Sequence, residues 1–362
     1  MSKIRMQRRD FLKLGAITAG AAMISGCEIT DKAESSAAQV RALLDPDGGM
    51  MEILRYASLA ASGHNTQPWK FGLDGNTIEI HPDLTRSLPV VDPQERELWI
   101  SLGCALENLV IAAAASGFTA QIDYPEEGRQ FIKIALQPSA PQQSPLFDAI
   151  PFRQSTRTEY KVASLLQDNR DMIYAAASEP GVVVQYLDDQ ASLEQVLEYV
   201  NQGNLTQYSD AAFMAELIEW IRFNKNDALA TLDGLYSKCS GSPTVPRWIG
   251  RMVVSGTLPQ NQADADAIKM RSSQGAILLA SEKEDLASWV HVGQVFERLS
   301  LTLTSLGMKS SLLNQPIEVP ELRDQFREAM GLGSSQPQLL LRYGYADAMP
   351  YSLRRPVQDL LM

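Results

Sequence analysis

Two segments of the chain match each other at a constant offset, and this internal repeat constrains the fold more than any other feature. The first segment runs from Leu98 to Gly117 and the second from Ser288 to Gly307. The shared positions lie 190 residues apart: Trp99, Gly103, Glu107, Leu109 and Gly117 recur as Trp289, Gly293, Glu297, Leu299 and Gly307. Both segments are mostly apolar and end at a glycine, which predicts two long, buried helices with glycine C-caps.

Short strand-like runs accompany each predicted helix. Residues 131–136 follow the first helix, residues 338–345 follow the second, and residues 275–280 precede the second. Residues 69–73 and 77–80 flank an Asp-Gly-Asn turn, which is a hairpin signal. Each half is therefore predicted to be helices plus a small sheet, an α+β pattern. Gly103 and Gly293 would let another helix approach closely, and Asp92-Pro93 is the expected start of the first helix.

The division of the chain follows from this repeat. The stretch 138–148, rich in Pro, Ser and Gln, is the predicted linker between half one (residues 50–137) and half two (residues 149–362). Half two contains residues 227–267, which we expect to be a long, irregular insertion. A duplicated α+β unit of this kind fits a dimer fused within one chain.

Composition excludes several classes of protein. Hydrophobic residues are 45% and charged residues 21%, as in ordinary globular proteins, and the formal net charge is −11. A surface this acidic disfavours nonspecific nucleic-acid binding, so we expect no nucleic-acid partner. Three cysteines and three histidines lack the spacing of a zinc site or a disulfide framework, and no metal site is predicted. Cys104, inside an apolar helical pattern, is expected to be a buried small hydrophobe.

The N-terminus has the features of an export address. Arg8-Arg9-Asp10-Phe11-Leu12-Lys13 is similar to a twin-arginine signal, and a short apolar run follows it. The run ends at Ile24-Ser25-Gly26-Cys27, which resembles a bacterial lipobox with Cys27 as the lipidated residue. An ordinary cleaved signal with a chance cysteine is the alternative. Residues 1–27 are therefore expected to be the signal and residues 28–49 a tether.

The export signal predicts a location and a class of protein. It implies the twin-arginine export machinery as a partner and the periplasmic face of a membrane as the location. The lipid anchor would be the one contact with that membrane. The twin-arginine route carries folded proteins, and this raises the expectation of a tightly bound cofactor.

The segment Ser62-Gly63-His64-Asn65-Thr66-Gln67-Pro68-Trp69 resembles the Ser-x-x-Asn-x-Gln-Pro-Trp segment of FMN-dependent nitroreductases. A polar loop followed by a core tryptophan is the alternative interpretation. Further matches favour the family. Pro151-Phe152-Arg153-Gln154-Ser155-Thr156-Arg157 resembles its Arg-x-Ser-x-Arg opening, and Asp92 to Leu98 is typical of its Acg-like branch.

Two more segments near the end of the chain complete the resemblance. Asn314-Gln315-Pro316-Ile317-Glu318 is similar to the family's Pro-Ile-Glu turn, whose backbone N–H groups face the flavin. Leu353-Arg354-Arg355-Pro356 resembles its closing segment, whose basic residues complete a phosphate site. The resemblance covers residues 50–358. It implies a nitroreductase fold in which the two halves form an intramolecular pseudo-dimer.

The resemblance also implies which residues bind FMN. Counterparts of these segments in the opposite halves are degenerate, so we expect one FMN per chain, bound between the halves. A cluster of four arginines would hold its phosphate, since the guanidinium fork suits bidentate contacts. The expected cofactor-binding residues are Ser62, His64, Asn65, Gln67, Arg153, Gln154, Ser155, Arg157, Asn224, Pro316, Ile317, Glu318, Arg354 and Arg355.

The implied activity is an FMN-dependent oxidoreductase of the NAD(P)H nitroreductase type. It would transfer two electrons to a nitroaromatic, a quinone or a similar acceptor. The flavin carries this chemistry, so no catalytic side chain is predicted. Because NAD(P)H is scarce outside the cytoplasm, an exported enzyme would need another electron source.

The alternatives concern access to the flavin. If Trp248, Met252 or Leu258 of the insertion roof the site as a lid, the protein would sequester or store FMN without turnover. A loop packing on itself is the plainer interpretation of the insertion. A cofactor-free structural lipoprotein with a decayed fold is a third class. His291, on the second repeat helix, is expected to be a hydrogen-bonded core histidine.

Overall fold

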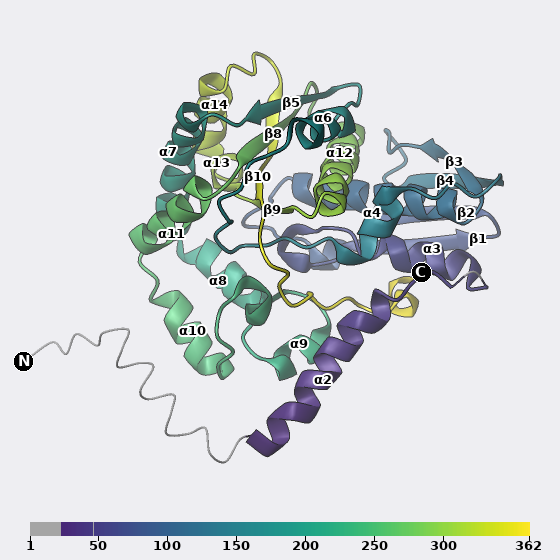
Figure 1. The fold of residues 1–362 in the computed structure, drawn as a ribbon, viewed down its shortest axis with the longest axis horizontal. Coiled ribbons are helices and arrows are strands. Elements are labelled where there is room, and N and C mark those ends of the chain that lie inside the picture. Colours follow the sequence, from purple (N-terminus) through teal and green to yellow (C-terminus); the bar gives the residue numbers. More distant parts are fainter. Residues whose placement is uncertain (1–22, 46) are drawn as a thin grey trace, which may run out of the picture.

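The structure, a computed structural model, describes residues 23–45 and 47–362 (Figure 1). Residues 1–22, most of the predicted signal, lie outside the described residues. Cys27 belongs to helix α2 (Met23–Val40), and so does the stretch 28–39 that was expected to be a tether. α2 is joined to helix α3 (Gly49–Ala57), which leads into the first half.

Each half contains one four-stranded antiparallel sheet, and the two sheets have the same strand order. The first sheet has the order β1-β2-β4-β3 and the second the order β5-β8-β10-β9. The first consists of β1 (Trp69–Asp74), β2 (Thr77–Pro82), β3 (Phe118–Asp123) and β4 (Ile132–Pro138). The second consists of β5 (Val182–Leu187), β8 (Gly275–Ser281), β9 (Lys309–Leu312) and β10 (Gln336–Gly344). The α+β pattern, the hairpin and the repeat predicted from the sequence are therefore confirmed.

The two repeat helices form the centre of the molecule. They are α4 (Arg96–Ala115) and α12 (Leu286–Ser305), and they lie against each other between the two sheets (Figure 1). A Cβ built on Gly103 would lie 2.1 Å from the Val290 carbonyl oxygen, and one built on Gly293 would lie 2.0 Å from that of Ile100. The contact is reciprocal, so the predicted close approach of a helix at both glycines is confirmed.

The ends of these helices only partly follow the prediction. Gly117 and Gly307 adopt the left-handed conformation just beyond the two C-termini, as expected of glycine C-caps. The expected start of α4 at Asp92-Pro93 was wrong, because the helix begins at Arg96 after Glu95, whose φ is 59°. Asp92 still helps to cap it, since its carboxylate accepts the Leu98 N–H at 2.9 Å.

The remaining helices cover the second half and extend it on one side (Figure 1). Residues 227–267 are largely helical rather than irregular, because proline marks two helix starts there and polar side chains face the solvent. The helices are α5 (Pro145–Ala149), α6 (Gln167–Ala176), α7 (Gln190–Gln207), α8 (Ala211–Trp220), α9 (Lys225–Thr231), α10 (Arg247–Ser255), α11 (Pro259–Arg271), α13 (Gln315–Glu318) and α14 (Pro320–Ala329). A short parallel pair, β6 (Ile221–Arg222) and β7 (Leu235–Tyr236), lies among them.

One core runs through both halves and includes most of α4 and α12. Cys104 is buried in it, as predicted, with 1% of its surface exposed. Among the described residues, α4 alone is long and apolar enough to cross a membrane, yet 83% of its apolar window is buried in the fold. It is therefore a core helix. His291 departs from its prediction: it is half-buried and its ring lies tilted against that of Tyr124. Its Nδ1 lies 3.6 Å from a Glu179 carboxylate oxygen and has no hydrogen-bond partner among the described residues.

Candidate functional site

The loop between α3 and β1 has an unusual backbone. His64, Asn65 and Gln67 adopt positive φ angles of 45°, 55° and 53°. Side chains other than glycine rarely take this conformation, and such strained residues concentrate at functional sites. The Ser62 hydroxyl oxygen accepts the Gln67 N–H at 3.1 Å and pins the turn. The loop is therefore held in a specific shape, with its side chains aimed by the backbone.

Two side chains of this loop join it to segments far along the chain. The Asn65 Oδ1 accepts a hydrogen bond from Arg354 at 2.6 Å, and its Nδ2 donates to the Gly234 carbonyl at 3.1 Å. Gln67 is fully buried and accepts the Arg355 N–H at 2.9 Å through its Oε1. Asn65 lines a cavity, whereas Gln67 lines neither cavity described below. Gln67 therefore anchors the loop to the closing segment.

A small cavity of about 80 Å³ beside this loop is lined by four arginines. Three of them, Arg153, Arg157 and Arg354, are the ones expected from the sequence. The fourth is Arg41, which follows α2, and it takes the place expected for Arg355. The Arg355 side chain instead lies near Asp83, at 4.0 Å, and donates to the Asp359 carbonyl, so it points away from this cavity.

The arginine pocket, as we call this cavity, is strongly positive. Its lining includes no carboxylate among the described residues. One counter-ion lies behind it: Glu297, fully buried on α12, is 2.9 Å from Arg153 Nε. Burial, with the neighbouring Arg41 and Arg153, lowers the pKa of Arg354 well below its usual range. Uncompensated buried charge is costly, so the arrangement favours a bound anion.

Neutral groups complete the arginine pocket. Gln154 and Ser155 line it, beside Ser62 and Asn65 from the loop. Gln154 is held through both ends of its amide by the main chain of Met349, which donates an N–H at 3.2 Å and also accepts a hydrogen bond. These residues come from both halves of the sequence, as expected for a composite site.

A larger chamber of about 590 Å³ adjoins the arginine pocket. The two share Ala61, Ser62, Ser155, Arg157, Leu235 and Ser240 in their linings. This volume lies in the range of ligand and cofactor sites. The chamber takes residues from α4, α7, α8, α12 and the turn at α13, so it lies between the halves.

His64 and Arg157 face this chamber without partners. The His64 Nδ1 is buried and has no hydrogen-bond partner among the residues that the structure describes. Burial first, and the charge of Arg157 second, lower the pKa of His64 to about 4. Arg157 makes no hydrogen bond or ion pair with any described residue, and it lines both cavities. A neutral imidazole and a free guanidinium are therefore available to a ligand at neutral pH.

Two acidic side chains also line the chamber. Glu97 and Glu318 both line it, and Glu318 accepts a hydrogen bond from the Gln207 amide at 2.7 Å. Burial, followed by the charge of Glu97, raises the pKa of Glu318 to about 8. Pro316 and Ile317, in the same turn as Glu318, are buried and line neither cavity. Glu318 thus presents a protonated carboxylic acid to the chamber at neutral pH.

Comparison with known proteins shows which proteins the chain resembles. No protein-family model matches the chain. Two Mycobacterium tuberculosis proteins, each named "Putative NAD(P)H nitroreductase", align with most of it. Rv3131 is 27% identical over 330 residues, covering 85% of this chain and 90% of Rv3131. The protein acg is 24% identical over 321 residues, covering 85% of this chain and 93% of acg. The chain is therefore similar in sequence, over most of its length, to proteins named as nitroreductases.

One solved structure is also similar to this chain. It is the FMN-dependent nitroreductase NfnB from Mycobacterium smegmatis in complex with NADPH, at 13% identity and a TM-score of 0.36. The match covers 56% of this chain and 88% of NfnB. The two sequence relatives align with both halves of this chain.

The insertion, residues 227–267, contributes residues to the chamber that the sequence did not suggest. Val254 at the end of α10 and Thr257 just beyond it line the chamber. Trp248, Met252 and Leu258, which the sequence suggested as a roof, are 69%, 63% and 62% exposed and do not line it. Amphipathic α10 packs Gly250 against Phe223 and leaves Trp248 and Met252 in solvent. Leu258 lies beyond α10, at the start of α11.

Two functional features were missed or misplaced by sequence reasoning. Arg41 belongs to no recognisable motif, and nothing local shows that its segment returns to the arginine pocket. Asn224, suggested as a ligand, caps α9 instead, where its Oδ1 accepts the Asp227 N–H at 3.0 Å. An asparagine three residues before an aspartate at a helix start is a cap signal, which could have identified this role.

Proposed function

We propose that this protein binds one FMN between its two halves and transfers two electrons from it to a nitroaromatic, a quinone or a similar acceptor. The observation that carries the proposal is the arginine pocket opening beside a chamber of about 590 Å³. The pocket matches a phosphate monoester in charge and donor geometry, and the chamber matches a planar heterocycle in size. The names of the relatives support the redox activity.

The chain's own residues would divide the work along this site. Arg157, free of protein partners among the described residues, would bind the phosphate, with Arg153 and Arg354 adding positive charge around it. The strained loop would place Ser62, His64 and Asn65 against the ring system. When bound, FMN supplies the hydride-transfer chemistry. Glu318, in the chamber wall, would hold a proton that is available to a reduced acceptor.

The order of electron transfer can be tested directly. The purified protein is expected to be yellow with a flavin spectrum, and NADH or NADPH is expected to bleach it without oxygen. Reoxidation by a nitroaromatic or quinone would then complete the cycle. A colourless protein that takes up no FMN would overturn cofactor binding. A yellow protein that neither nucleotide bleaches would overturn the NAD(P)H-dependent reaction.

A second candidate, storage or sequestration of FMN, is favoured by one observation. Residues of the insertion, Val254 and Thr257, form part of the chamber wall and restrict access from that side. If this wall excludes acceptors, dithionite-reduced protein would be reoxidised no faster by a nitroaromatic than by buffer. Rapid reoxidation by the acceptor would rule out sequestration as the main role.

We also propose that the protein is exported as a lipoprotein. The twin-arginine signal and the lipobox at Cys27 support this, and an electron donor of the periplasm or membrane would then replace NAD(P)H in the cell. The test is labelling with a fatty-acid analogue followed by fractionation of wild type, Cys27→Ser and Arg8→Lys plus Arg9→Lys. Label that persists in Cys27→Ser would contradict lipidation, and export that persists without the arginine pair would contradict the route.

A further inference from the structure

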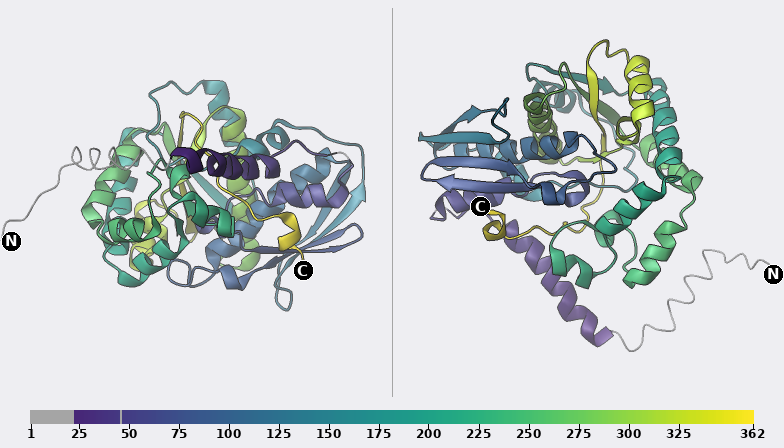
Figure 2. Two further views of the ribbon diagram at one scale, coloured as in Figure 1. Left: turned by 90° about the horizontal axis from the view of Figure 1, so that it is seen from below. Right: turned by 180° about the vertical axis from the view of Figure 1, so that it is seen from behind.

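Helix α2 lies beside the C-terminal segment (Figure 2), and Arg41, the residue after it, lines the arginine pocket. The side chains of α2 that the structure describes, from residue 32 onward, make few contacts with the rest of the protein. Glu34 forms an ion pair with Lys238 at 2.8 Å, and Ala37 is buried in a small cluster with Ala228, Tyr236 and Leu353. Val40, the last residue of α2, is partly buried against the large core of the two halves, and no other described residue of α2 packs on that core. The helix is therefore attached to the main core only at its C-terminal end.

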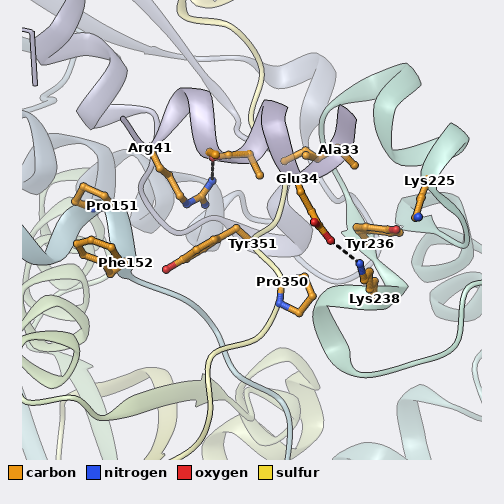
Figure 3. Close-up of a pocket in the computed structure, with 13 residues that line it drawn as sticks. Ala33, Glu34, Arg41, Pro151, Phe152, Lys225, Tyr236, Lys238, Pro350 and Tyr351 are labelled. Carbon is orange, nitrogen blue, oxygen red and sulfur yellow. Dashed lines mark hydrogen bonds and ion pairs between the residues drawn. The ribbon is translucent and has the colours of Figure 1, made fainter. Parts of the chain in front are cut away.

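A groove of about 350 Å³ remains under α2 (Figure 3). Its walls are mostly apolar and aromatic side chains from α2, from residues 151–152 and from the C-terminal segment. Arg41, Tyr236, Pro350 and Tyr351 line both this groove and the arginine pocket. The groove leaves α2 room to move, and Arg41 is the cation that α2 brings to the arginine pocket.

The four arginines differ in how many donors they have left. Arg354 is saturated, since its three nitrogens donate to six oxygens of the protein. Arg153 is engaged by Glu297 and by the Leu59 carbonyl at 3.2 Å. Arg157 makes no hydrogen bond with any described residue. The remaining donors of the pocket therefore come mainly from Arg157 and Arg41.

Arg41 is held in place by hydrogen bonds from one of its nitrogens, and its Nε has no hydrogen-bond partner among the described residues. Its Nη1 donates to the carbonyls of Ala37 at 3.3 Å and Ser352 at 3.2 Å, which fixes the guanidinium above the Tyr351 ring. Its Nε is buried without a hydrogen-bond partner in the described part of the chain. A buried, unsatisfied charged donor is costly, and buried donors in native proteins are normally satisfied. An acceptor in the arginine pocket would satisfy it.

We propose that Arg41 is a direct ligand of the FMN phosphate, together with Arg157, and that α2 is a clasp that closes over the phosphate end of the site. The proposal rests on FMN binding as the function of the site. It places a cofactor ligand outside the recognised motifs, on the segment that joins the folded body to the N-terminal region. Retention of the cofactor would then depend on whether α2 is docked.

The electrostatics of the pocket agree with this role. Burial, and then repulsion from Arg153, lower the pKa of Arg41 to about 10. An anion placed among the four arginines would reverse both effects, because it supplies the missing acceptor and the missing counter-charge. Docking of α2 and binding of the phosphate would therefore favour each other.

The decisive experiment compares two ligands that differ by the phosphate. Flavin-free protein is titrated with FMN and with riboflavin, as wild type, as Arg41→Met, and as the control Arg251→Met on α10. Losing charge-assisted hydrogen bonds to phosphate should raise the Kd for FMN about 10- to 100-fold. The Kd for riboflavin should change less than about 2-fold, because riboflavin has no phosphate for Arg41 to bind. The control should match wild type for both ligands.

The outcomes separate this inference from the proposed function. Equal weakening of FMN and riboflavin by Arg41→Met would show a structural role and overturn the ligand assignment, as would an unchanged Kd for FMN. Wild-type protein that binds neither ligand would overturn FMN binding itself.

The clasp is tested by loosening α2 without touching the arginine pocket. Glu34→Gln removes the ion pair with Lys238, and surface ion pairs of this kind contribute little. We expect FMN to dissociate about 2- to 5-fold faster in stopped-flow release. An unchanged dissociation rate would contradict closure by α2.

Discussion

The carboxylate of Glu297 lies 2.9 Å from the guanidinium of Arg153, and both groups are buried. The same carboxylate accepts the Ala61 N–H at 3.2 Å, just before the strained loop. The equivalent residue in the first repeat helix, Glu107, holds Arg298 at 2.7 Å instead. One acidic position of the repeat thus supports the cofactor site, and its counterpart supports an ion pair outside it.

Replacing Glu297 by glutamine should lower the free energy of unfolding, and the loss should be largest in the flavin-free protein. Arg153 would lose its counter-ion while remaining beside Arg41 and Arg354, and breaking a buried pair in this way costs ~3 kcal/mol or more. The measurement is urea unfolding of the flavin-free protein. FMN should restore part of the loss, because its phosphate supplies a new counter-charge. Glu219→Gln, on an exposed residue of α8, is the control and should change the free energy of unfolding by less than ~0.5 kcal/mol.

Arg157→Ala should weaken FMN binding at least about 10-fold and leave the flavin-free protein as stable as wild type or more so. The guanidinium has no described partner to lose, and its removal relieves repulsion within the arginine pocket. Arg355→Ala is the matched control, because its side chain lies outside the arginine pocket. Flavin fluorescence titration measures both Kd values. If Arg355→Ala weakened binding as much as Arg157→Ala, the phosphate end of the site would be misplaced.

Glu318 should make stability depend on pH. Burial and Glu97 raise its pKa from the ordinary carboxylate range to about 8, so the folded protein binds a proton that the unfolded chain has released. This contribution is fully present below about pH 4.5 and is lost as the pH rises through about 8, with a slope of up to ~1.4 kcal/mol per pH unit. Urea unfolding of wild type and Glu318→Gln at pH 5, 6.5 and 8 isolates it. Two parallel pH profiles would contradict the assignment.

The repeat helices should not tolerate a methyl group at their crossing. Gly103→Ala and Gly293→Ala would each bring a Cβ to about 2 Å from a backbone carbonyl oxygen of the facing helix. Backbone cannot move aside as a flexible side chain can, so each change should cost ~3 kcal/mol or more. Gly72→Ala, whose Cβ would meet Glu79 at an ordinary 3.4 Å, is the control. Thermal unfolding ranks the three, and a control as unstable as the others would refute the explanation.

Features with a local cause could be predicted from the sequence. Periodicity and turn chemistry identify features that depend only on neighbouring residues. These features are the Asp74-Gly75 turn, the glycines after both repeat helices and the apolar runs of the strands. The repeat also predicted that a helix approaches closely at Gly103 and Gly293, and the structure shows that each glycine faces the other helix of the pair. Three of the four arginines of the pocket were expected, since they lie in segments that resemble a known pattern.

The remaining features depend on how distant segments meet. Arg41 reaches the arginine pocket only because α2 returns across the C-terminal segment, and its surrounding sequence gives no sign of this. The pKa of Glu318 is raised first by burial and then by Glu97, more than two hundred positions earlier in the chain. Trp248 and Met252 are apolar, but one amphipathic helix turns them towards solvent. Such outcomes are decided by packing, which local patterns do not contain.

The crossing of α4 and α12 has a consequence for how the site behaves at low protein concentration. In an assembly of separate subunits, an interface of this kind is in equilibrium with its dissociated parts, and dilution opens it. Here both helices belong to one polypeptide, so their association is intramolecular and its effective concentration is fixed by the linker. A site built across the two halves therefore keeps its affinity however few copies are present, and a single molecule suffices to hold its ligand.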